Sequence, residues 1–423
     1  MLVDITVKNF GPFYDEARLS LQRTSLDGHD ENLLMDDAIG EELLCSAVIF
    51  GPNSSGKSYM IRAVEILQNI VRAPLVANMK IPWYVPFRLT KDSMNEPTDM
   101  RIRFTDDGVL YDYSVSFTDS IITKESLYHY PQKKRSKVFE RDGSTFTFGR
   151  AVSKGMRTIE HFTSPNSTFL SVAARLNNKV CSIAHRCIIN DILVIGSNPS
   201  ALMTAVIDRM NSDRNVKERL IRAMKIADLG IDDIIGSVNK KKVTELGNDI
   251  PPQMVGLMML SGNTEVIDTR LYMRHGFSDV DVPSERLDFP YEIESNGTMQ
   301  LFCLIGPIID ALEYGRTIFI DEFGAFLHSD ISRWIIGQFK RTSNPKDAQI
   351  VVNTHDQMLM DLDLLRRDQI VFTQKNDRTG RSEIYALSDF NETRANMDVR
   401  KNYSLGRFGA LPSISSDDLL MKE

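Results

Sequence analysis

The feature that most constrains this chain is a predicted strand, loop and helix built around the pattern G-x-x-x-x-G-K-S. An apolar run from Leu43 to Phe50 predicts a buried strand, and apolar residues at helical spacing predict the helix that follows. Glycines let such a loop curl until its N–H groups converge on an anion, and the helix N-terminus adds its positive dipole end. The sequence therefore predicts a site for a nucleoside triphosphate. The loop residues are Gly51, Pro52, Asn53, Ser54, Ser55, Gly56, Lys57 and Ser58.

Two side chains of this loop have predicted roles toward ATP and its metal ion. Lys57 would reach the outer phosphates, and the Ser58 hydroxyl would ligate Mg²⁺. The expected cofactors are therefore ATP and Mg²⁺.

A second pattern places two acids after an apolar strand. The residues from Thr317 to Ile320 predict the strand, and Asp321 and Glu322 follow it. Asp321 would hold Mg²⁺, and Glu322 would orient and deprotonate an attacking water. The alternative is a strand followed by a solvated acidic turn. The order of the two patterns along the chain favours the catalytic interpretation.

Two further polar clusters stand at predicted element boundaries. His355 follows the apolar strand that ends near Thr354, and it would contact the γ-phosphate and sense hydrolysis. Ser295, Gly297 and Thr298 precede a long apolar helix, where a small loop at a helix N-terminus can bind an anion. A plain N-cap at Ser295 or Thr298 is the alternative for the second cluster, and both interpretations can hold together.

Bulk composition limits the classes of partner and compartment. The net charge is −7 and the pI about 5.6, whereas a dedicated nucleic-acid binder is usually basic. The four cysteines lack metal-ligand spacing, and nothing predicts a disulfide framework. No apolar run is long enough to span a bilayer, so we expect a cytoplasmic protein without a membrane partner.

The order of predicted elements indicates an α/β fold with a split nucleotide-binding core. The first third alternates as antiparallel strands, residues 168–245 have a helical pattern, and strand patterns return from Met254 to Leu260 and from Glu265 to Met273. Strands and helices alternate after residue 299, including a predicted helix from Met358 to Leu365. We therefore predict three parts: residues 1–167 and 291–423 as two halves of an ATPase head, and residues 168–290 as a helical, mixed insertion.

These motifs, in this order, resemble the ABC-type ATPases of the SMC and RecF kind, and most closely the AAA15 family of bacterial ATPases found in abortive-infection and other anti-phage systems. The resemblance covers nearly the whole chain. Beyond the motifs above, it is carried by Ile5 to Phe13, Pro86 to Leu89, Asn166 to Ser171, Ala227 to Ile231, Glu294 to Thr298, Phe326 to His328, Lys401 to Tyr403 and Gly406 to Pro412.

The resemblance implies an ABC-type head that dimerises around ATP. Two heads would sandwich two nucleotides, with Ser295, Gly297 and Thr298 of one copy facing the phosphate loop of the other. Glu322 would be the general base, His355 the switch histidine, and residues 324–328 the inter-head loop. The sequence departs from the general ABC pattern in its signature, Ser-Asn-Gly-Thr rather than Leu-Ser-Gly-Gly. A lid-loop glutamine is not placed, and the insertion is too short for a long coiled coil.

The function implied by the resemblance is anti-phage defence by a sensor ATPase that controls a separate effector. The tail from Asn391 to Glu423 holds only scattered acids, so a nuclease would have to be supplied in trans. The alternative is a RecF-like repair clamp that binds DNA directly. Two basic clusters, residues 133–137 and 240–242, could contact DNA or a partner. A scaffold that uses ATP only as structural glue is a third possibility, and an intact Glu322 argues against it.

Overall fold

The computed structural model describes residues 1–150, 155–227, 230–242, 265–276, 288–390 and 397–412. The chain divides into two compact units. The first combines Met1–Ser197 with Ala311–Glu423, and the second is Asn198–Asp310. These boundaries differ from the predicted division at residues 167/168 and 290/291, and that division of the ATPase head stays a prediction.

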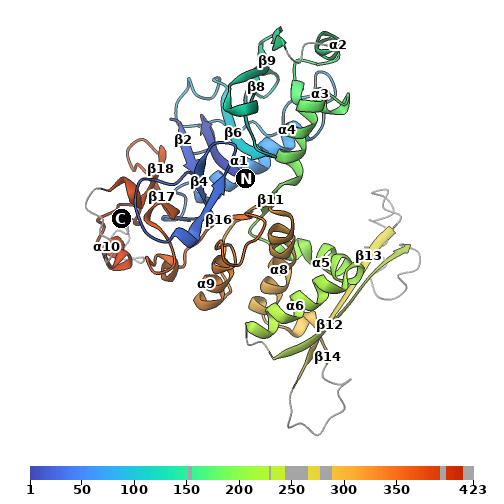
Figure 1. Ribbon diagram of the computed structural model, residues 1–423, viewed down its shortest axis with the longest axis vertical. Helices are drawn as coiled ribbons and strands as arrows, with labels where there is room; N and C mark the ends of the chain where they lie inside the picture. The colour runs from blue at the N-terminus through green and yellow to red at the C-terminus, as the bar shows by residue number, and fades with distance from the viewer. Residues whose placement is uncertain (151–154, 228–229, 243–264, 277–287, 391–396, 413–423) are drawn as a thin grey trace, which may run out of the picture. The chain divides into compact units, whose positions relative to one another are not determined.

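The N-terminal part of the first unit is an antiparallel sheet of seven strands (Figure 1). The strands lie in the order β10-β9-β8-β7-β6-β1-β2, and each neighbouring pair is antiparallel. This confirms the predicted antiparallel first third. The strands are β1 (Leu2–Lys8), β2 (Ala17–Ser20), β6 (Thr98–Asp106), β7 (Val109–Phe117), β8 (Ile122–Tyr130), β9 (Ser136–Asp142) and β10 (Thr145–Phe148).

Alternation along these strands buries an aromatic and aliphatic core. Tyr113, Phe139 and Phe169 are fully buried, and the rings of Phe139 and Phe169 lie 4.6 Å apart. Phe169 begins the helix α3, so the sheet and the helices that follow it share this core. These helices are α2 (Met156–His161), α3 (Phe169–Arg175) and α4 (Lys179–Asn190).

A second sheet of the first unit has the order β11-β15-β16-β5-β17-β18. Its first five strands are parallel, and β18 pairs antiparallel with β17. The strands are β5 (Ser46–Phe50), β11 (Ile192–Ile195), β15 (Thr317–Ile320), β16 (Gln349–Asn353), β17 (Ile370–Lys375) and β18 (Ser382–Ala386). The other elements of this unit are β3 (Leu33–Asp36), β4 (Glu41–Leu44), α1 (Lys57–Arg72), α9 (Ser329–Gly337) and α10 (Val399–Ser404), with short 3-10 turns between them. The parallel sheet beside an antiparallel one confirms the predicted α/β class.

Several sequence predictions were wrong in detail. The predicted strand from Leu43 to Phe50 is two strands, β4 and β5, which pair with different neighbours. The region 168–245 is not helical throughout, because β11 and β12 (Ile231–Lys242) lie within it. The predicted helix from Met358 to Leu365 is only the 3-10 turn Gln357–Leu359 followed by loop. The predicted strand from Met254 to Leu260 lies outside the described residues.

The second unit packs two helices on an antiparallel sheet. β12, β13 (Glu265–His275) and β14 (Asp288–Pro290) form the sheet, and α5 (Met203–Ser212) and α6 (Arg214–Ile226) contact β12. Its core includes Val206, Ile207, Leu220, Ile234 and Leu271, all buried. The helix α8 (Asn296–Tyr314) begins in this unit and ends in the first.

The four cysteines are free and buried. In the part of the chain that the structure describes, every helix is too short or too polar to cross a bilayer.

Candidate nucleotide-binding site

The phosphate loop connects β5 to α1 through backbone conformations that glycine favours. Gly51 has a φ of 149° and Gly56 a φ of 112°. A Cβ on Gly51 would lie 2.4 Å from the Thr373 carbonyl oxygen, so no larger residue fits there without a shift of the backbone. Ser55 and Thr373 share a hydrogen bond of 2.6 Å between their hydroxyls, which ties the loop to β17. The loop is therefore held in shape by its neighbouring strand.

The Lys57 side chain folds back onto the loop. Its Nζ donates to the carbonyl oxygens of Gly51, at 2.7 Å, and Pro52, at 3.0 Å. Burial lowers the pKa of Lys57 to about 8, although Asp321 and Glu322 favour the charged amine. A bound phosphate would supply the nearby negative charge that restores the charged form.

The parallel pairing of β5, β15 and β16 brings three polar strand ends to one edge. The phosphate loop follows β5, Asp321 and Glu322 follow β15, and Asn353 is the last residue of β16. Carboxyl ends of parallel strands are where ligands bind in open α/β sheets. The structure thus places the predicted acids and the phosphate loop side by side.

Asn353 connects these groups, a role that its local sequence pattern did not predict. Its Nδ2 donates to Asp321 Oδ1 and lies 3.5 Å from Ser58 Oγ, and its Oδ1 accepts the Glu322 N–H at 2.6 Å. The side chain is buried, with 1% of its surface exposed. The only sequence signal was a polar residue ending a buried strand, immediately before Thr354 and His355.

Glu322 and His355 face solvent beside this network. Glu322 is exposed and has a φ of 53°, a left-handed conformation that a non-glycine residue adopts at a cost of about 1–3 kcal/mol. Partial burial, and then the charge of Lys57, lower the pKa of His355, while Glu322 opposes this shift. The imidazole is therefore neutral near pH 7, and its one N–H group can donate a hydrogen bond to a phosphate oxygen.

Most of these side chains line one cavity of about 630 Å³. Its volume is in the range of about 300–1,000 Å³ that is typical of small-molecule sites. It is lined by Pro12, Asn53, Ser54, Gly56, Lys57, Ser58, Tyr59, Glu322, Asn353, His355 and Lys375. Gly51, Pro52 and Asn53 also line a neighbouring cavity of about 450 Å³. Mg²⁺ prefers oxygen ligands, and the Asn353 amide lies close to two of them, on Ser58 and Asp321. These two residues therefore fit a magnesium site.

The predicted signature residues lie in the second unit, at the start of α8. Ser295 Oγ accepts the Thr298 N–H at 3.0 Å and lies 2.8 Å from Thr298 Oγ1. This is an N-cap, so the plain structural interpretation holds. The proposed approach of Ser295, Gly297 and Thr298 to a second copy's nucleotide stays a prediction.

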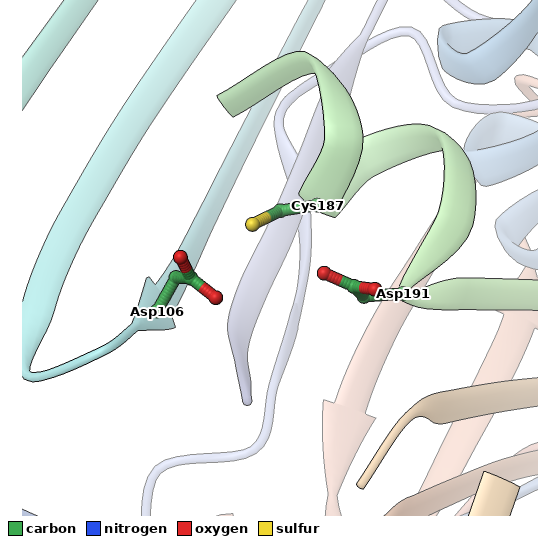
Figure 2. Close-up of side chains that lie close together, drawn as sticks. All are labelled: Asp106, Cys187 and Asp191. Carbon is green, nitrogen blue, oxygen red and sulfur yellow. The ribbon is translucent and has the colours of Figure 1, made fainter. Parts of the chain in front are cut away.

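A second group of potential metal ligands lies outside the nucleotide cavity. Ligand atoms of Asp106, Cys187 and Asp191 converge within 4.8 Å of one another (Figure 2). However, the Arg186 guanidinium donates to Asp106 at 2.7 Å and lies 3.7 Å from Asp191. Burial raises the pKa of Cys187, so its sulfur is a thiol. The arginine already supplies the positive charge, and we interpret the group as an ion-pair network.

Comparison with known families decides the class of this site. Residues 46–361, about three quarters of the chain, match the family described as "AAA domain, putative AbiEii toxin, Type IV TA system". The chain belongs to this AAA-domain family. It is accordingly a nucleotide-binding ATPase, and the matched range contains the phosphate loop, both acids and His355. The narrower AAA15 assignment stays a prediction.

Solved structures of SMC head domains also match this AAA-domain protein. An SMC head bound to the C-winged helix domain of ScpA has 13% identity and a TM-score of 0.43, covering 91% of this chain and 97% of that one. The SMC head domain from Thermotoga maritima has 14% identity and a TM-score of 0.41, covering 91% and 98%. An SMC head with an extended coiled coil from Pyrococcus furiosus, bound to the C-terminal domain of ScpA, has 11% identity and a TM-score of 0.39, covering 96% and 98%. No curated protein matches the sequence.

Proposed function

We propose that this AAA-domain ATPase slowly hydrolyses ATP with Mg²⁺ and uses the ATP-bound state to regulate a separate effector in anti-phage defence. The observation that supports hydrolysis is the Asn353 network, because one amide contacts the proposed Mg²⁺ ligands Ser58 and Asp321 and the backbone of Glu322. Bound Mg²⁺ would neutralise charge that develops on the phosphates.

The other steps use side chains of this chain. Lys57 binds the outer phosphates, for which it gives up its contacts with Gly51 and Pro52. Glu322 orients a water molecule and takes its proton as the water attacks the γ-phosphate. His355, neutral near pH 7, holds a γ-phosphate oxygen and loses that contact when the phosphate leaves.

A second copy of the chain would complete the site. Asn53, Ser54, Ser58, Glu322 and His355 are all exposed, whereas hydrolysis is favoured where bulk water is excluded. Ser295, Gly297 and Thr298 of the second copy would close over the γ-phosphate. ATP would then bridge two heads, bind the dimeric state better than the monomer, and shift the population toward it until hydrolysis releases the pair.

The proposed role is that of a sensor whose nucleotide state holds or activates an effector protein, expected to be a nuclease. The toxin–antitoxin system in the description of the matching family is consistent with such a partner. A RecF-like clamp on DNA is the second candidate, favoured by the exposed cluster of Lys133, Lys134 and Arg135. The guanidinium carbon of Arg135 lies 3.8 Å from the centroid of the Tyr128 ring, so this arginine is held over an aromatic face.

A pull-down from cells that carry the native locus tests this role. Wild type is compared with Lys57→Ala, which should not bind ATP, and Glu322→Gln, which should bind ATP without hydrolysing it. Protein and nucleic acid are analysed in the same eluate. A stoichiometric protein partner whose retention differs between the two variants supports the sensor. Co-purifying DNA without a protein partner supports the clamp instead. A protein partner that all three samples retain equally contradicts the sensor, and eluates with neither protein partner nor DNA contradict both proposals.

A further inference from the structure

We propose that Asn353 is a positioning residue that sets the metal-binding carboxylate and the general base as one unit. The inference rests on the proposed Mg²⁺-dependent hydrolysis, in which Asp321 and Glu322 have different tasks but are adjacent in sequence. The carboxamide of Asn353 is hydrogen-bonded to both residues: its NH₂ group donates to Asp321, and its carbonyl oxygen accepts from Glu322.

The first function of this amide is to fix the Asp321 carboxylate. Asn353 Nδ2 donates to Oδ1 of Asp321, and Oδ2 accepts no hydrogen bond from the part of the chain that the structure describes. The same nitrogen lies 3.5 Å from Ser58 Oγ, the other proposed metal ligand. Because one oxygen is occupied, the carboxylate presents the other oxygen to a metal ion. Hydrogen-bond partners of metal ligands commonly set ligand orientation in this way.

The second function is to hold the backbone at Glu322. The Glu322 N–H donates to Asn353 Oδ1 at 2.6 Å, and the Glu322 carbonyl accepts the Ala325 N–H at 3.3 Å. These bonds help to hold the left-handed φ of 53° at Glu322. That conformation turns the chain immediately after β15, and Glu322 lines the cavity from there. Without the amide, the general base would lose a fixed starting position.

Few other short side chains can do both tasks. Asn353 is 1% exposed, so each of its polar atoms needs a partner inside the protein, and the site residues supply them. Alanine removes every side-chain hydrogen bond of this position. Serine retains a hydroxyl but lacks the reach and the second donor of a carboxamide.

The test compares the full-length wild type with Asn353→Ala, and with Gln349→Ala as a matched control. Gln349 is the first residue of β16, is 0% exposed, and its amide bonds to Leu2 and Thr317, away from the nucleotide cavity. A fluorescent ATP analogue is bound without metal, and Mg²⁺ is then added to find the concentration that gives half of the fluorescence change. Steady-state kcat and thermal unfolding are measured on the same samples.

Asn353→Ala is expected to bind the analogue normally without metal, because the phosphate loop is intact. The half-saturating Mg²⁺ concentration should rise about 10–100-fold, and kcat should fall about 10²-fold from the misplaced base. Gln349→Ala should lose comparable thermal stability with neither change. If Asn353→Ala and Gln349→Ala match in both readouts, Asn353 is only structural and the inference fails.

Two further results separate this inference from the proposed function. If Asn353→Ala does not fold, Asn353→Ser is measured, and its Mg²⁺ midpoint must rise in the same direction for the inference to stand. If the wild type binds ATP but does not hydrolyse it, the proposed hydrolysis fails. The Mg²⁺ midpoint still decides the positioning role in that case, because it is read from binding alone.

Discussion

Substitution of Gly51 by alanine should damage the phosphate loop through one backbone contact. The added Cβ would lie 2.4 Å from the Thr373 carbonyl oxygen and 2.7 Å from Thr373 Oγ1, at a φ of 149°. The nearest atom belongs to the backbone of β17, which pairs with β5, so it cannot rotate away. Conformational strain of about 1–3 kcal/mol and overpacking of about 1–3 kcal/mol together predict a loss of about 2–6 kcal/mol in unfolding free energy.

Gly143→Ala is the matched control. Gly143 has a φ of 58° in the turn between β9 and β10, and nothing lies within 4 Å of its added Cβ. The unfolding free energy of Gly143→Ala should therefore fall only by the cost of a left-handed alanine, about 1–2 kcal/mol. Urea unfolding followed by tryptophan fluorescence reports the first unit, because Trp83 and Trp334 both lie in it. If Gly51→Ala loses no more stability than Gly143→Ala, the contact with Thr373 does not constrain the loop and the reasoning is refuted.

Three other predictions concern titratable side chains. The pKa of Lys57 is lowered to about 8 from 10.5, so between these pH values the unfolded chain binds more protons than the nucleotide-free protein. The unfolding free energy of the nucleotide-free protein should therefore rise with pH from about 8 to 10.5. In a series of denaturant titrations, Lys57→Met should abolish that rise. His355→Ala should leave ATP affinity nearly unchanged and lower kcat about 10²-fold; an equal loss of affinity in equilibrium binding would show that the histidine is needed for binding itself. Glu125→Ala should destabilise the first unit by about 3–5 kcal/mol. The substitution removes the carboxylate that is paired with the buried Arg141 guanidinium, and it removes the acceptor of the Phe169 and Leu170 N–H groups. A urea midpoint within error of the wild type would contradict this.

The parts of the site that depend on short sequence spans could be predicted. The phosphate loop follows from glycines and an apolar run within a few residues of Lys57, because such local patterns fix backbone conformation directly. The same holds for Asp321 and Glu322 after their strand. The parallel order of β15, β16 and β5 brings them together as the alternation of elements indicated.

The parts that depend on distant partners could not be predicted. β11 is four residues long and lies between helices, so its strand character appears only through pairing with β15. The residues from Met358 to Leu365 have apolar positions that fit a helix, but Leu359 is buried at the end of a 3-10 turn and Leu365 in the loop that follows it. Asn353 was missed because its partner Ser58 lies 295 positions away in the chain. Local periodicity carries no record of such contacts.

The most direct test of an ATP-bridged dimer is the mass of Glu322→Gln in solution. Light scattering after size exclusion is measured with ATP, with ADP and without nucleotide, together with the amount of nucleotide bound. We predict that ATP raises the mass from that of one 48.0 kDa chain to about twice that value or a higher multiple, and that ADP does not. A protein that binds ATP in full and keeps the same mass in all three conditions would contradict the proposal.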